Sequence, residues 1–471
     1  MIWHTHRPQS GSFATVPSVC AARPAKELWT ITRADGVRLN GATLLVAALL
    51  ASATGLAVYV GRSAGMAGAL VALALLLWTQ AGLKLVAMFS AARPLEGPEP
   101  DRWPEFTLLV PLLHEAASVP RLVSALEALD YPVARLDIRL LCEAHDADTR
   151  AAVAREIVRP GRSHFALVVV PEGGPRTKPN ALRHGMRGAT GEIVTVYDAE
   201  DAPDPGQLRA AARALLAHPD HAAVQAPLGV DNLAPGWITR QFSLEYASLF
   251  HVWLPWLARS GLQLPLGGTS NHIRRSALES CGGWDVFNVT EDADLAYRLD
   301  YGAPGCGRRI GWIAPPTAEE AVASLRAWRR QRSRWMKGFA QTWAAHTLNW
   351  RAWRAPGAWR RQLSVQVGIG LALLTSLLHA PTLALVGLGS LAGYPPPATV
   401  LWVGAAFYAS GLLVTVAGAR RAGLALRAGD VASVPLYWLL MCLPAWIGVL
   451  ELATRPHAWN KTEHGVSPRA S

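Results

Sequence analysis

The stretch Ile193-Val-Thr-Val-Tyr-Asp-Ala-Glu-Asp201 joins a short apolar run to a cluster of acidic residues. The run Ile193–Tyr197 is rich in β-branched residues, which is typical of a buried β-strand. Asp198, Glu200 and Asp201 then follow at the end of that strand. In a parallel α/β sheet, ligands bind beyond the carboxyl ends of the strands, so this stretch predicts both a fold and a site.

Further strand and helix patterns alternate along the chain on either side of this stretch. Three more apolar runs are expected β-strands: Phe106–Leu113, Ile138–Cys142 and Phe165–Val170. The segment Val119–Leu129 has the apolar spacing of a helix. Strands that alternate with helices indicate a mostly parallel α/β sheet. Residues 100–345 are therefore expected to form one α/β domain, with Asp146 and Asp198 facing the same crevice.

The composition predicts a membrane part beside this domain. The chain has 471 residues, of which 51% are hydrophobic and 17% charged, and its mean hydropathy is +0.17. That is too apolar for an ordinary soluble enzyme and too charged for a pure membrane bundle. The formal charge of +11 fits nucleic acid, an anionic membrane surface or anionic substrates. Because most arginines cluster beside hydrophobic spans, the membrane is favoured and no nucleic-acid partner is expected.

Uncharged runs before the domain predict a transmembrane hairpin over residues 41–90. Gly41–Val60 and Ser63–Leu83 contain no charged residue and are joined at Arg62. About twenty apolar residues are enough to cross a bilayer as a helix. Residues 1–40 carry basic residues without an early apolar core, so they are expected to be a disordered cytoplasmic tail.

A second hydrophobic block follows the domain. Residues 362–419 contain no Asp, Glu, Lys or Arg and are long enough for two transmembrane helices, with the turn at Pro395–Pro397. The apolar segment 431–453 contains two prolines, so crossing, re-entrant and interfacial placements all stay open. Arginines flank these spans, which places residues 100–345 in the cytoplasm and leaves 454–471 as a C-terminal tail.

The acidic residues are candidates for metal binding and proton transfer. Asp198 and Glu200 are spaced so that both carboxylates can reach Mg²⁺ or Mn²⁺, which would neutralise a leaving diphosphate. A solvated acidic turn is the alternative for such a pair taken alone. Thr290-Glu291-Asp292 opens an expected helix, and Asp292, with Glu291 beside it, is a candidate general base for an acceptor hydroxyl. Acids that complement the helix dipole are the alternative there.

Two further candidates lie on loops. Asp146, in the acidic loop Glu143–Asp148, is expected to bind a nucleobase or ribose. The alternative is a loop that caps the next helix through Asp148 or Thr149. Lys178 lies at the start of a helix, where it is well placed for a phosphate or for the metal carboxylates. A surface cation is the alternative for this lysine.

The segment 326–345 has the pattern of an amphipathic helix on the membrane surface. Four large side chains fall on one helical face: Trp328, Trp335, Phe339 and Trp343. Gln331 and Arg334 are candidates for binding a diphosphate, and Trp335 for stacking on an acceptor sugar. A plain interfacial anchor is the alternative, because Trp and Arg are both favoured at membrane surfaces.

Two other segments belong to the expected acceptor side. The loop Gly267–Ser270 is expected to approach the acceptor through Gly268, Thr269 and Ser270, although on its own it is only a turn. Trp237–Leu257 is aromatic-rich with few charges, and it is expected to be a second interfacial helix.

Taken together, these ordered motifs resemble the processive family 2 glycosyltransferases, the group of bacterial cellulose, chitin and hyaluronan synthases. Three stretches resemble a branch that makes β-glucan-type exopolysaccharides: Tyr197–Leu208, Gly267–His272 and Val289–Leu295. The resemblance runs from about residue 100 to the stretch Trp459–Gly465. It is specific for the superfamily and much less specific for the sugar.

The resemblance implies a GT-A (Rossmann-like) catalytic domain inserted between transmembrane α-helices. It also implies Mg²⁺ or Mn²⁺ as cofactor and inverting transfer from a UDP-α-sugar, with UDP-glucose as the first candidate. The product would be a growing β-linked polysaccharide that the same protein exports across the bilayer. The implied location is the inner membrane of a bacterial cell.

The resemblance further assigns roles to residues of this chain. Asp146 would bind the nucleobase, Asp198 and Glu200 the metal diphosphate, and Asp292 would be the base. Three residues would lie at the mouth of a transmembrane polymer channel: Gln331, Arg334 and Trp335. This chain departs from the usual pattern at Glu200, where Asp is common, and at His145, where an acid commonly precedes Asp146.

Two other functions compete with polymer synthesis. One is a non-processive transferase that adds a single sugar to a lipid-linked acceptor. The other is a membrane scaffold with a decayed catalytic domain, against which the intact set of Asp198, Glu200 and Asp292 argues. Partner proteins of an export machinery cannot be named from the sequence.

Overall fold

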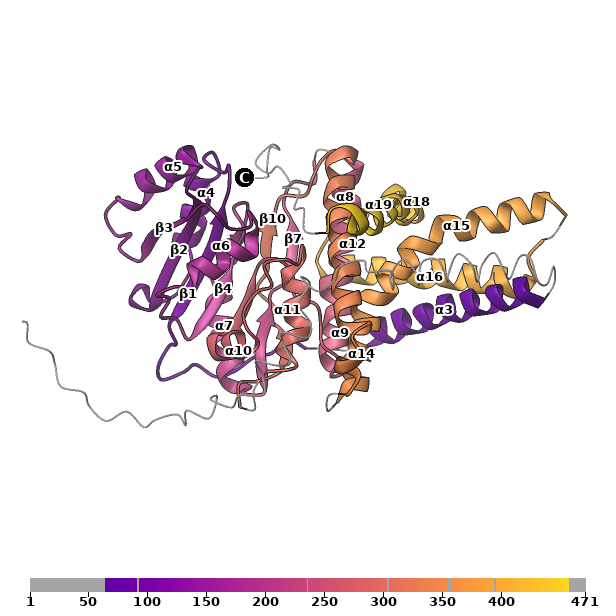
Figure 1. The fold of residues 1–471 in the computed structure, drawn as a ribbon, viewed down its shortest axis with the longest axis horizontal. Coiled ribbons are helices and arrows are strands. Elements are labelled where there is room, and N and C mark those ends of the chain that lie inside the picture. The colour runs from indigo at the N-terminus through magenta and orange to yellow at the C-terminus, as the bar shows by residue number, and fades with distance from the viewer. Residues whose placement is uncertain are drawn as a thin grey trace, which may run out of the picture.

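The protein consists of an α/β domain and a bundle of long helices that extends from it (Figure 1). The computed structural model describes residues 64–90, 93–234, 236–302, 305–354, 357–393 and 395–456. The expected tail 1–40, the first hairpin span 41–60 and the C-terminal residues after 456 lie outside the described residues.

A seven-stranded sheet forms the centre of the domain, in the order β3-β2-β1-β4-β8-β6-β9. Its strands are β1 Phe106–Leu112, β2 Leu136–Glu143, β3 Phe165–Val170, β4 Ile193–Val196, β6 His221–Gln225, β8 Asn271–Arg274 and β9 Arg309–Trp312. The strands β1 to β4 pair in parallel, as do β6 and β9. Only β8 is antiparallel to its described neighbours, β4 and β6. The expected mostly parallel α/β sheet is therefore confirmed.

The central strand β1 is buried on both faces, because its alternate side chains enter two different cores. Leu108 and Val110 pack in the core beneath three helices: α4 Val119–Glu127, α5 Ala147–Ile157 and α7 Gln207–Ala217. Leu109 packs on the opposite face, beneath three others: α6 Lys178–Gly185, α10 Arg275–Ser280 and α11 Glu291–Leu299. This two-sided cover holds the carboxyl ends of β1 and β4 in fixed positions.

A small three-stranded sheet connects the acidic loop to the membrane side of the domain. It has the order β5-β10-β7, with bounds β5 Ala202–Pro203, β7 Leu228–Val230 and β10 Thr317–Glu319. β5 follows Asp201 directly, and β10 leads into the long helix α12 (Leu325–Thr347). The acids after β4 and the start of α12 are thus linked through paired strands.

Two long helical stretches lie between the sheet and the membrane helices (Figure 1). Ser324 is the N-cap of α12, and its hydroxyl accepts a hydrogen bond from the backbone N–H of Ala327. The other stretch is continuous: α8 Trp237–Ser248, the π-helical turn η3 Leu249–Trp253 and α9 Leu254–Arg259. Both segments expected to be interfacial helices are therefore helical.

Three described helical stretches are long and apolar enough to cross a membrane: Ala358–Leu391, Ala398–Arg421 and Val434–Thr454. The first stretch comprises α14 Ala358–Val365, the π-helical turn η4 Gln366–Gly370 and α15 Leu371–Leu391. The second stretch is the single helix α16. The third stretch comprises α18 Val434–Leu440 and α19 Cys442–Thr454. Pro397 is the N-cap of α16, at the position of the expected turn. Shorter helices complete the chain: η2 Val133–Arg135, α13 Trp350–Arg354 and α17 Ala428–Ala432.

The helix α3 (Ala64–Phe89) contains the second expected span of the hairpin and packs against α16. Figure 1 shows α3, α15 and α16 extending away from the domain. The helices α18 and α19 instead lie at the base of this bundle, where α19 packs against α12.

Candidate active site

A cavity of about 490 Å³ joins the α/β domain to the membrane helices. Its domain end lies beyond the carboxyl ends of β1 and β4, where eight acidic side chains line the wall: Glu115, Glu143, Asp198, Glu200, Glu291, Asp292, Glu319 and Glu320. Its middle is lined by α8, η3 and α12, and its far end by α3, α15 and α16. One continuous space therefore connects the acidic cluster with the membrane bundle.

Three of the expected motifs meet at Lys178. Its ammonium donates a hydrogen bond to the Asp198 carboxylate and another to the backbone oxygen of Gly268, at 2.7 Å. A β-carbon on Gly268 would lie 3.5 Å from the Asp292 carboxylate and 3.5 Å from the Lys178 ammonium. The expected metal acid, the expected base and the lysine thus surround one small space that the glycine leaves open.

The carboxylates around this space repel one another. Burial, and then the neighbouring Asp198, raise the pKa of Glu200 to about 8. Burial, and then Asp292, raise the pKa of Glu291 to about 8, and burial also raises the pKa of Asp292. Buried acids that are held this close are stabilised by a bound cation. The oxygen donors of Asp198 and Glu200 are the kind that Mg²⁺ and Mn²⁺ prefer, so the residues fit the expected metal.

Asp201 shapes the loop that presents these acids. Its carboxylate accepts hydrogen bonds from the backbone N–H of Asp198, at 2.6 Å, and from the Thr269 hydroxyl. The next residue, Ser270, has a φ of 54° and donates its hydroxyl to Thr317 at 2.6 Å. Thr269 lines the cavity, whereas Ser270 does not and is fully buried. The expectation that Ser270 contacts an acceptor is therefore not supported, because its side chain holds the loop in place.

Asp146 lies in a different position from the one expected. Its carboxylate accepts hydrogen bonds from the backbone N–H of His114, at 2.5 Å, and of Thr149, at 3.2 Å, so it is the N-cap of α5. Burial opposes these hydrogen bonds, but they hold the pKa of Asp146 below its usual value. Asp146 does not line the cavity, whereas Glu143, three residues earlier, does. The expected alternative, a capping loop, is found, although Asp146 itself provides the cap.

Three candidates on α12 line the middle of the cavity: Gln331, Arg334 and Trp335. The ring of Trp335 stacks on that of Tyr246, with centroids 6.4 Å apart and an interplanar angle of 11°. Burial lowers the pKa of Arg334, and the carboxylates of Glu291 and Asp292 oppose that shift. The Gln331 Oε1 atom is buried and has no hydrogen-bond partner among the described residues. This helix therefore presents a cation, an amide and an aromatic face to the same space.

Arg332 connects this part of α12 to the neighbouring helices. Its guanidinium lies 4.1 Å from the centroid of the Trp335 ring and forms an ion pair of 2.7 Å with Glu245 on α8. The Tyr437 hydroxyl on α18 donates to the same Glu245 carboxylate at 2.6 Å. The buried network ties α12 to α8 and α18, and the sequence pattern did not predict it.

Two tryptophans of the expected interfacial face donate hydrogen bonds to other helices. Trp328 is 1% exposed and donates its indole N–H to the Tyr437 hydroxyl at 2.9 Å. Trp343 donates its indole N–H to Gln366 at 2.8 Å. The expectation of a simple membrane-surface anchor is wrong for Trp328, because α18 covers this side chain, whereas Trp343 is half-buried.

Glycine residues let α12 approach two of its neighbours. A β-carbon on Gly338 would collide with the side chain of Thr290, which immediately precedes Glu291 and Asp292. Elsewhere on α12, a β-carbon on Gly448 of α19 would lie 2.6 Å from the backbone oxygen of Ser333. The helix is therefore packed closely against both the Thr290–Asp292 turn and a candidate membrane helix.

The cavity also contains acids that the sequence analysis missed. Burial, and then Glu200, raise the pKa of Glu319 to about 8. Glu319 lies at the end of β10 and is hydrogen-bonded to Tyr246, the residue on which Trp335 stacks. Only the pairing of β10 with β5 and β7 brings this glutamate to the site, so no local pattern could have revealed it.

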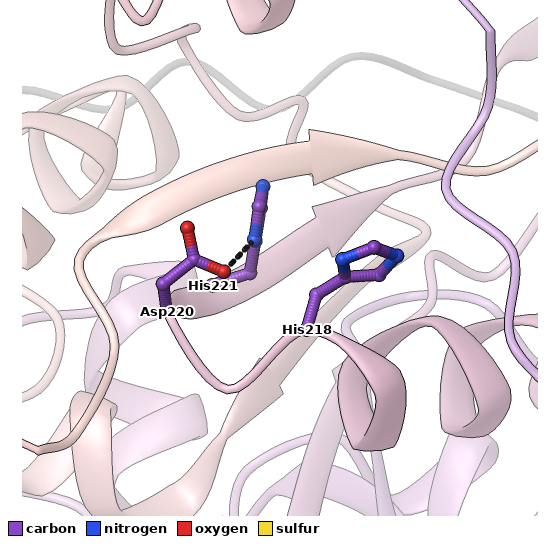
Figure 2. A group of neighbouring side chains, drawn as sticks. All are labelled: His218, Asp220 and His221. Carbon is purple, nitrogen blue, oxygen red and sulfur yellow. Dashed lines mark hydrogen bonds and ion pairs between the residues drawn. The ribbon is translucent and has the colours of Figure 1, made fainter.

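A separate cluster lies at the start of β6, where His218, Asp220 and His221 approach one another (Figure 2). Their potential ligand atoms all lie within 4.8 Å of one another. Asp220 accepts a hydrogen bond of 2.8 Å from His221 and also pairs with Arg309 at 3.3 Å. His218 bonds to the backbone oxygen of Glu96 at 3.1 Å. These contacts join β6, β9 and the segment before β1, which explains the cluster as a structural one.

Comparisons with known proteins agree with this architecture. The family model described as "Glycosyltransferase like family 2" matches residues 104–338. The probable glycosyltransferase YdaM of Bacillus subtilis is 26% identical over 243 residues, or 50% of this chain and 55% of that protein. The beta-monoglucosyldiacylglycerol synthase of Synechocystis sp. is 28% identical over 265 residues, which are 56% of this chain and 53% of that protein. The cellulose synthase catalytic subunit of Pseudomonas fluorescens is 27% identical over 252 residues, which are 52% of this chain and 32% of that protein.

The chain spans about half or less of the length of these curated relatives. Among solved structures, the mannosyltransferase PcManGT from Pyrobaculum calidifontis aligns with a TM-score of 0.57 and 22% identity, covering 82% of this chain and 99% of that one. This likeness confirms the expected GT-A fold. With the acidic cavity at the carboxyl ends of its strands, the α/β domain of this chain belongs to the family 2-like glycosyltransferases.

Proposed function

We propose that the protein is an inverting, divalent-cation-dependent hexosyltransferase that takes its sugar from a UDP-sugar, with UDP-glucose as the first candidate. The proposal rests above all on the meeting of Asp198, Lys178 and Asp292 around the space that Gly268 leaves open. Transfer from a nucleotide sugar needs a cation or a lysine at the diphosphate, and a base that takes the proton from the acceptor hydroxyl as it attacks the anomeric carbon. This arrangement provides both within one cavity.

In the proposed reaction, the acceptor hydroxyl oxygen attacks the anomeric carbon from the face opposite the diphosphate. The bond between that carbon and the diphosphate oxygen breaks, UDP leaves with the electron pair, and the hydroxyl proton passes to Asp292. A raised pKa suits Asp292 to this role, because a base that is too weak would not accept the proton. The attack from the opposite face would give a β-linkage from an α-linked donor.

Asp198 and Glu200 would hold the Mg²⁺ or Mn²⁺ ion. When bound, the ion supplies positive charge to the leaving diphosphate. Lys178 would add its own charge on the same side, because the Asp198 and Glu291 carboxylates, against the effect of burial, keep its pKa above the usual value. Arg334 approaches the same acids from α12 and would bind the diphosphate once the cation relieves their charge.

The product is proposed to be a β-linked polysaccharide, a β-glucan exopolysaccharide in the first instance, which passes into the membrane bundle as it grows. The supporting observation is the continuity of the cavity from Asp292, past Trp335, to α3, α15 and α16. An aromatic ring at this position would stack on the terminal sugar of the acceptor. The domain is proposed to face the cytoplasm of a bacterial cell, where nucleotide sugars are made, with the spans in the inner membrane.

A screen of UDP-sugars tests the proposal. Membranes containing the full chain would be supplied with each labelled UDP-sugar and with Mg²⁺ or Mn²⁺, and UDP release, product size and linkage would be measured. Asp292→Asn is the inactive variant, and Asp101→Asn, which changes an exposed acid outside the cavity, is its matched control. The proposal is wrong if no UDP-sugar gives UDP release above the Asp292→Asn background.

A second candidate is the transfer of one sugar to a lipid-linked acceptor. It is favoured by the polar side chains Gln80, Lys84 and His379, which line the membrane end of the cavity. The product decides between the two: a polymer of broad size distribution, or a glycolipid of fixed mass.

A further inference from the structure

The membrane end of the cavity is lined by polar side chains that the proposed chemistry does not use. Gln80 and Lys84 are four residues apart on α3, so they lie on one helical face. Thr375, Ser376 and His379 face the same cavity from α15. Polar and ionisable residues inside apolar membrane helices are costly, and they mark sites at which something polar is bound.

Lys84 brings a positive charge to this wall. Its ammonium lies 4.4 Å from the centroid of the Phe407 ring and 5.3 Å from that of Trp438. Aromatic faces attract a cation, but they contribute no negative charge that would neutralise it. In the described part of the chain, Lys84 forms no ion pair with a carboxylate. The cavity therefore offers a cation whose counter-ion must come from elsewhere.

Gln80 adds an unsatisfied hydrogen-bonding group beside this cation. The residue is 8% exposed, it lines the cavity, and its Oε1 atom has no hydrogen-bond partner among the described residues. A buried amide oxygen without a donor is unfavourable, so such an atom indicates a donor group that is supplied by a ligand. A cation next to an open acceptor suits a molecule that carries both an anionic group and a hydroxyl.

The depth of Lys84 indicates where this molecule comes from. Lys84 is five residues before the end of α3 at Phe89, or about 7 Å along the helix axis. At that end, Arg421 of α16 donates to the backbone oxygens of Met88, at 2.6 Å, and of His251, at 3.0 Å, which marks the base of the bundle against the domain. A lipid in the adjacent leaflet would reach this level with its head group while its chains remain in the bilayer.

We propose that the first sugar acceptor is a lipid with a phosphate in its head group, bound with the phosphate at Lys84. Gln80 lies one helical turn further from the domain than Lys84 and would accept a hydrogen bond from a donor nearer the acyl chains. A head group long enough to follow the cavity past Trp335 would bring a hydroxyl to Asp292. The inference rests on the proposed function, in which Asp292 takes the proton from that hydroxyl as its oxygen bonds to the anomeric carbon and UDP leaves. The phosphate itself is unchanged by the reaction.

Lipid retention tests the proposal without relying on turnover. The full chain, purified in detergent, would be incubated with phosphatidylglycerol or with diacylglycerol of the same acyl chains, and native mass spectrometry would count the retained lipid. Wild type should retain phosphatidylglycerol in preference to diacylglycerol. Lys84→Met should weaken that retention by about tenfold, the value of one lost charge-assisted contact, whereas Lys84→Arg should keep most of it. Arg427→Gln, which changes an exposed arginine outside the cavity, should retain phosphatidylglycerol like wild type.

Three results would overturn the inference: equal retention of the two lipids by wild type, equal retention of phosphatidylglycerol by wild type and Lys84→Met, or full displacement of the lipid by an equal concentration of inorganic phosphate. The last result would indicate a site for free phosphate. A lipid-free preparation that elongates a soluble oligosaccharide at the full rate would also contradict a lipid acceptor. Failure of the proposed function has a different signature, namely the absence of UDP release from every UDP-sugar, whatever the lipid retention.

Discussion

The Lys178 ammonium donates to the Asp198 carboxylate and, at 2.7 Å, to the backbone oxygen of Gly268. One lysine therefore connects the acid at the end of β4 with the loop that faces Asp292. In the absence of a cation this contact partly neutralises the acids, and it would place a positive charge beside a bound diphosphate. The lysine and the metal ion are thus expected to share one carboxylate.

Asp198→Asn should abolish turnover without unfolding the protein. The substitution removes one negative charge and one metal ligand, while the backbone hydrogen bond from Asp198 to Asp201 can remain. UDP release should be lost in this variant at any Mn²⁺ concentration, and in wild type after treatment with EDTA, with recovery only in wild type when Mn²⁺ is restored. Near-normal activity of the variant at saturating Mn²⁺ would contradict the assignment, and Asp101→Asn is the control.

Asp292→Asn should separate binding from chemistry. A base acts after the donor is bound, so UDP affinity should stay near the wild-type value while transfer falls by roughly a hundredfold or more. Calorimetry with UDP and a steady-state assay measure the two quantities. Parallel losses of affinity and rate would instead identify Asp292 as a binding or structural residue.

The pH dependence of wild type should follow from the same residue. Burial raises the pKa of Asp292 above its usual value, and a base works only when it is deprotonated. The rate should therefore fall as the pH decreases through that raised pKa, which lies above the value of about 3.9 for a free aspartate. A kcat/KM profile whose acidic limb stays at the free-aspartate value would contradict this expectation.

Gly268→Ala should reduce activity more than stability. The added β-carbon would lie 3.5 Å from both the Asp292 carboxylate and the Lys178 ammonium, which is an ordinary van der Waals distance that the fold can accept. It would nevertheless occupy the space in which the reacting groups must meet, so we expect a loss of about tenfold or more in kcat/KM. A melting temperature near that of wild type, measured beside the rate, distinguishes this effect from unfolding.

Trp335→Ala and Arg334→Ala should affect different steps. Loss of the aromatic face should shorten the product and weaken acceptor binding by about 1–2 kcal/mol, while UDP binding is retained. Arg334→Ala should weaken UDP binding, because it removes positive charge near the diphosphate acids. Product length and UDP affinity are compared at equal amounts of membrane-inserted protein. Full-length product from Trp335→Ala at a rate proportional to its expression would exclude the acceptor role.

Arg332→Met should destabilise the contact between the domain and the membrane helices. The arginine is 1% exposed and pairs with Glu245, whose side chain is 32% exposed, so its removal leaves a partly buried carboxylate beside Tyr437. Leaving this partly exposed carboxylate without its partner costs on the order of 1–3 kcal/mol, which should lower the melting temperature of the purified protein. Arg330→Met, an exposed position on the same helix, should melt like wild type. Equal melting temperatures for both variants would show that the ion pair contributes no net stability.

Features that depend on neighbouring residues could be predicted from the sequence, and features that depend on distant ones could not. The runs that form β1 to β4 are apolar and β-branched, so their strands follow from local patterns. The sequence predicts that Asp146 faces the crevice, but its carboxylate accepts a hydrogen bond from the backbone N–H of His114, a residue on another loop. The sequence pattern places Trp328 at the membrane surface, because it does not show that Trp328 packs against Tyr437, a residue of a helix more than a hundred residues later. The cavity acid Glu319 was missed for the same reason.

The two glycine contacts of α12 connect the proposed reaction centre to a candidate membrane helix. Gly448 brings α19 against the backbone of Ser333 on α12, and Gly338 brings α12 against Thr290, two residues before the proposed base Asp292. Neither contact contains a flexible side chain that could absorb a displacement. If thinning or thickening of the surrounding lipid shifted α19, the contacts would therefore move α12 as a rigid body, and Asp292 with it. Membrane composition would in this way set the catalytic rate mechanically.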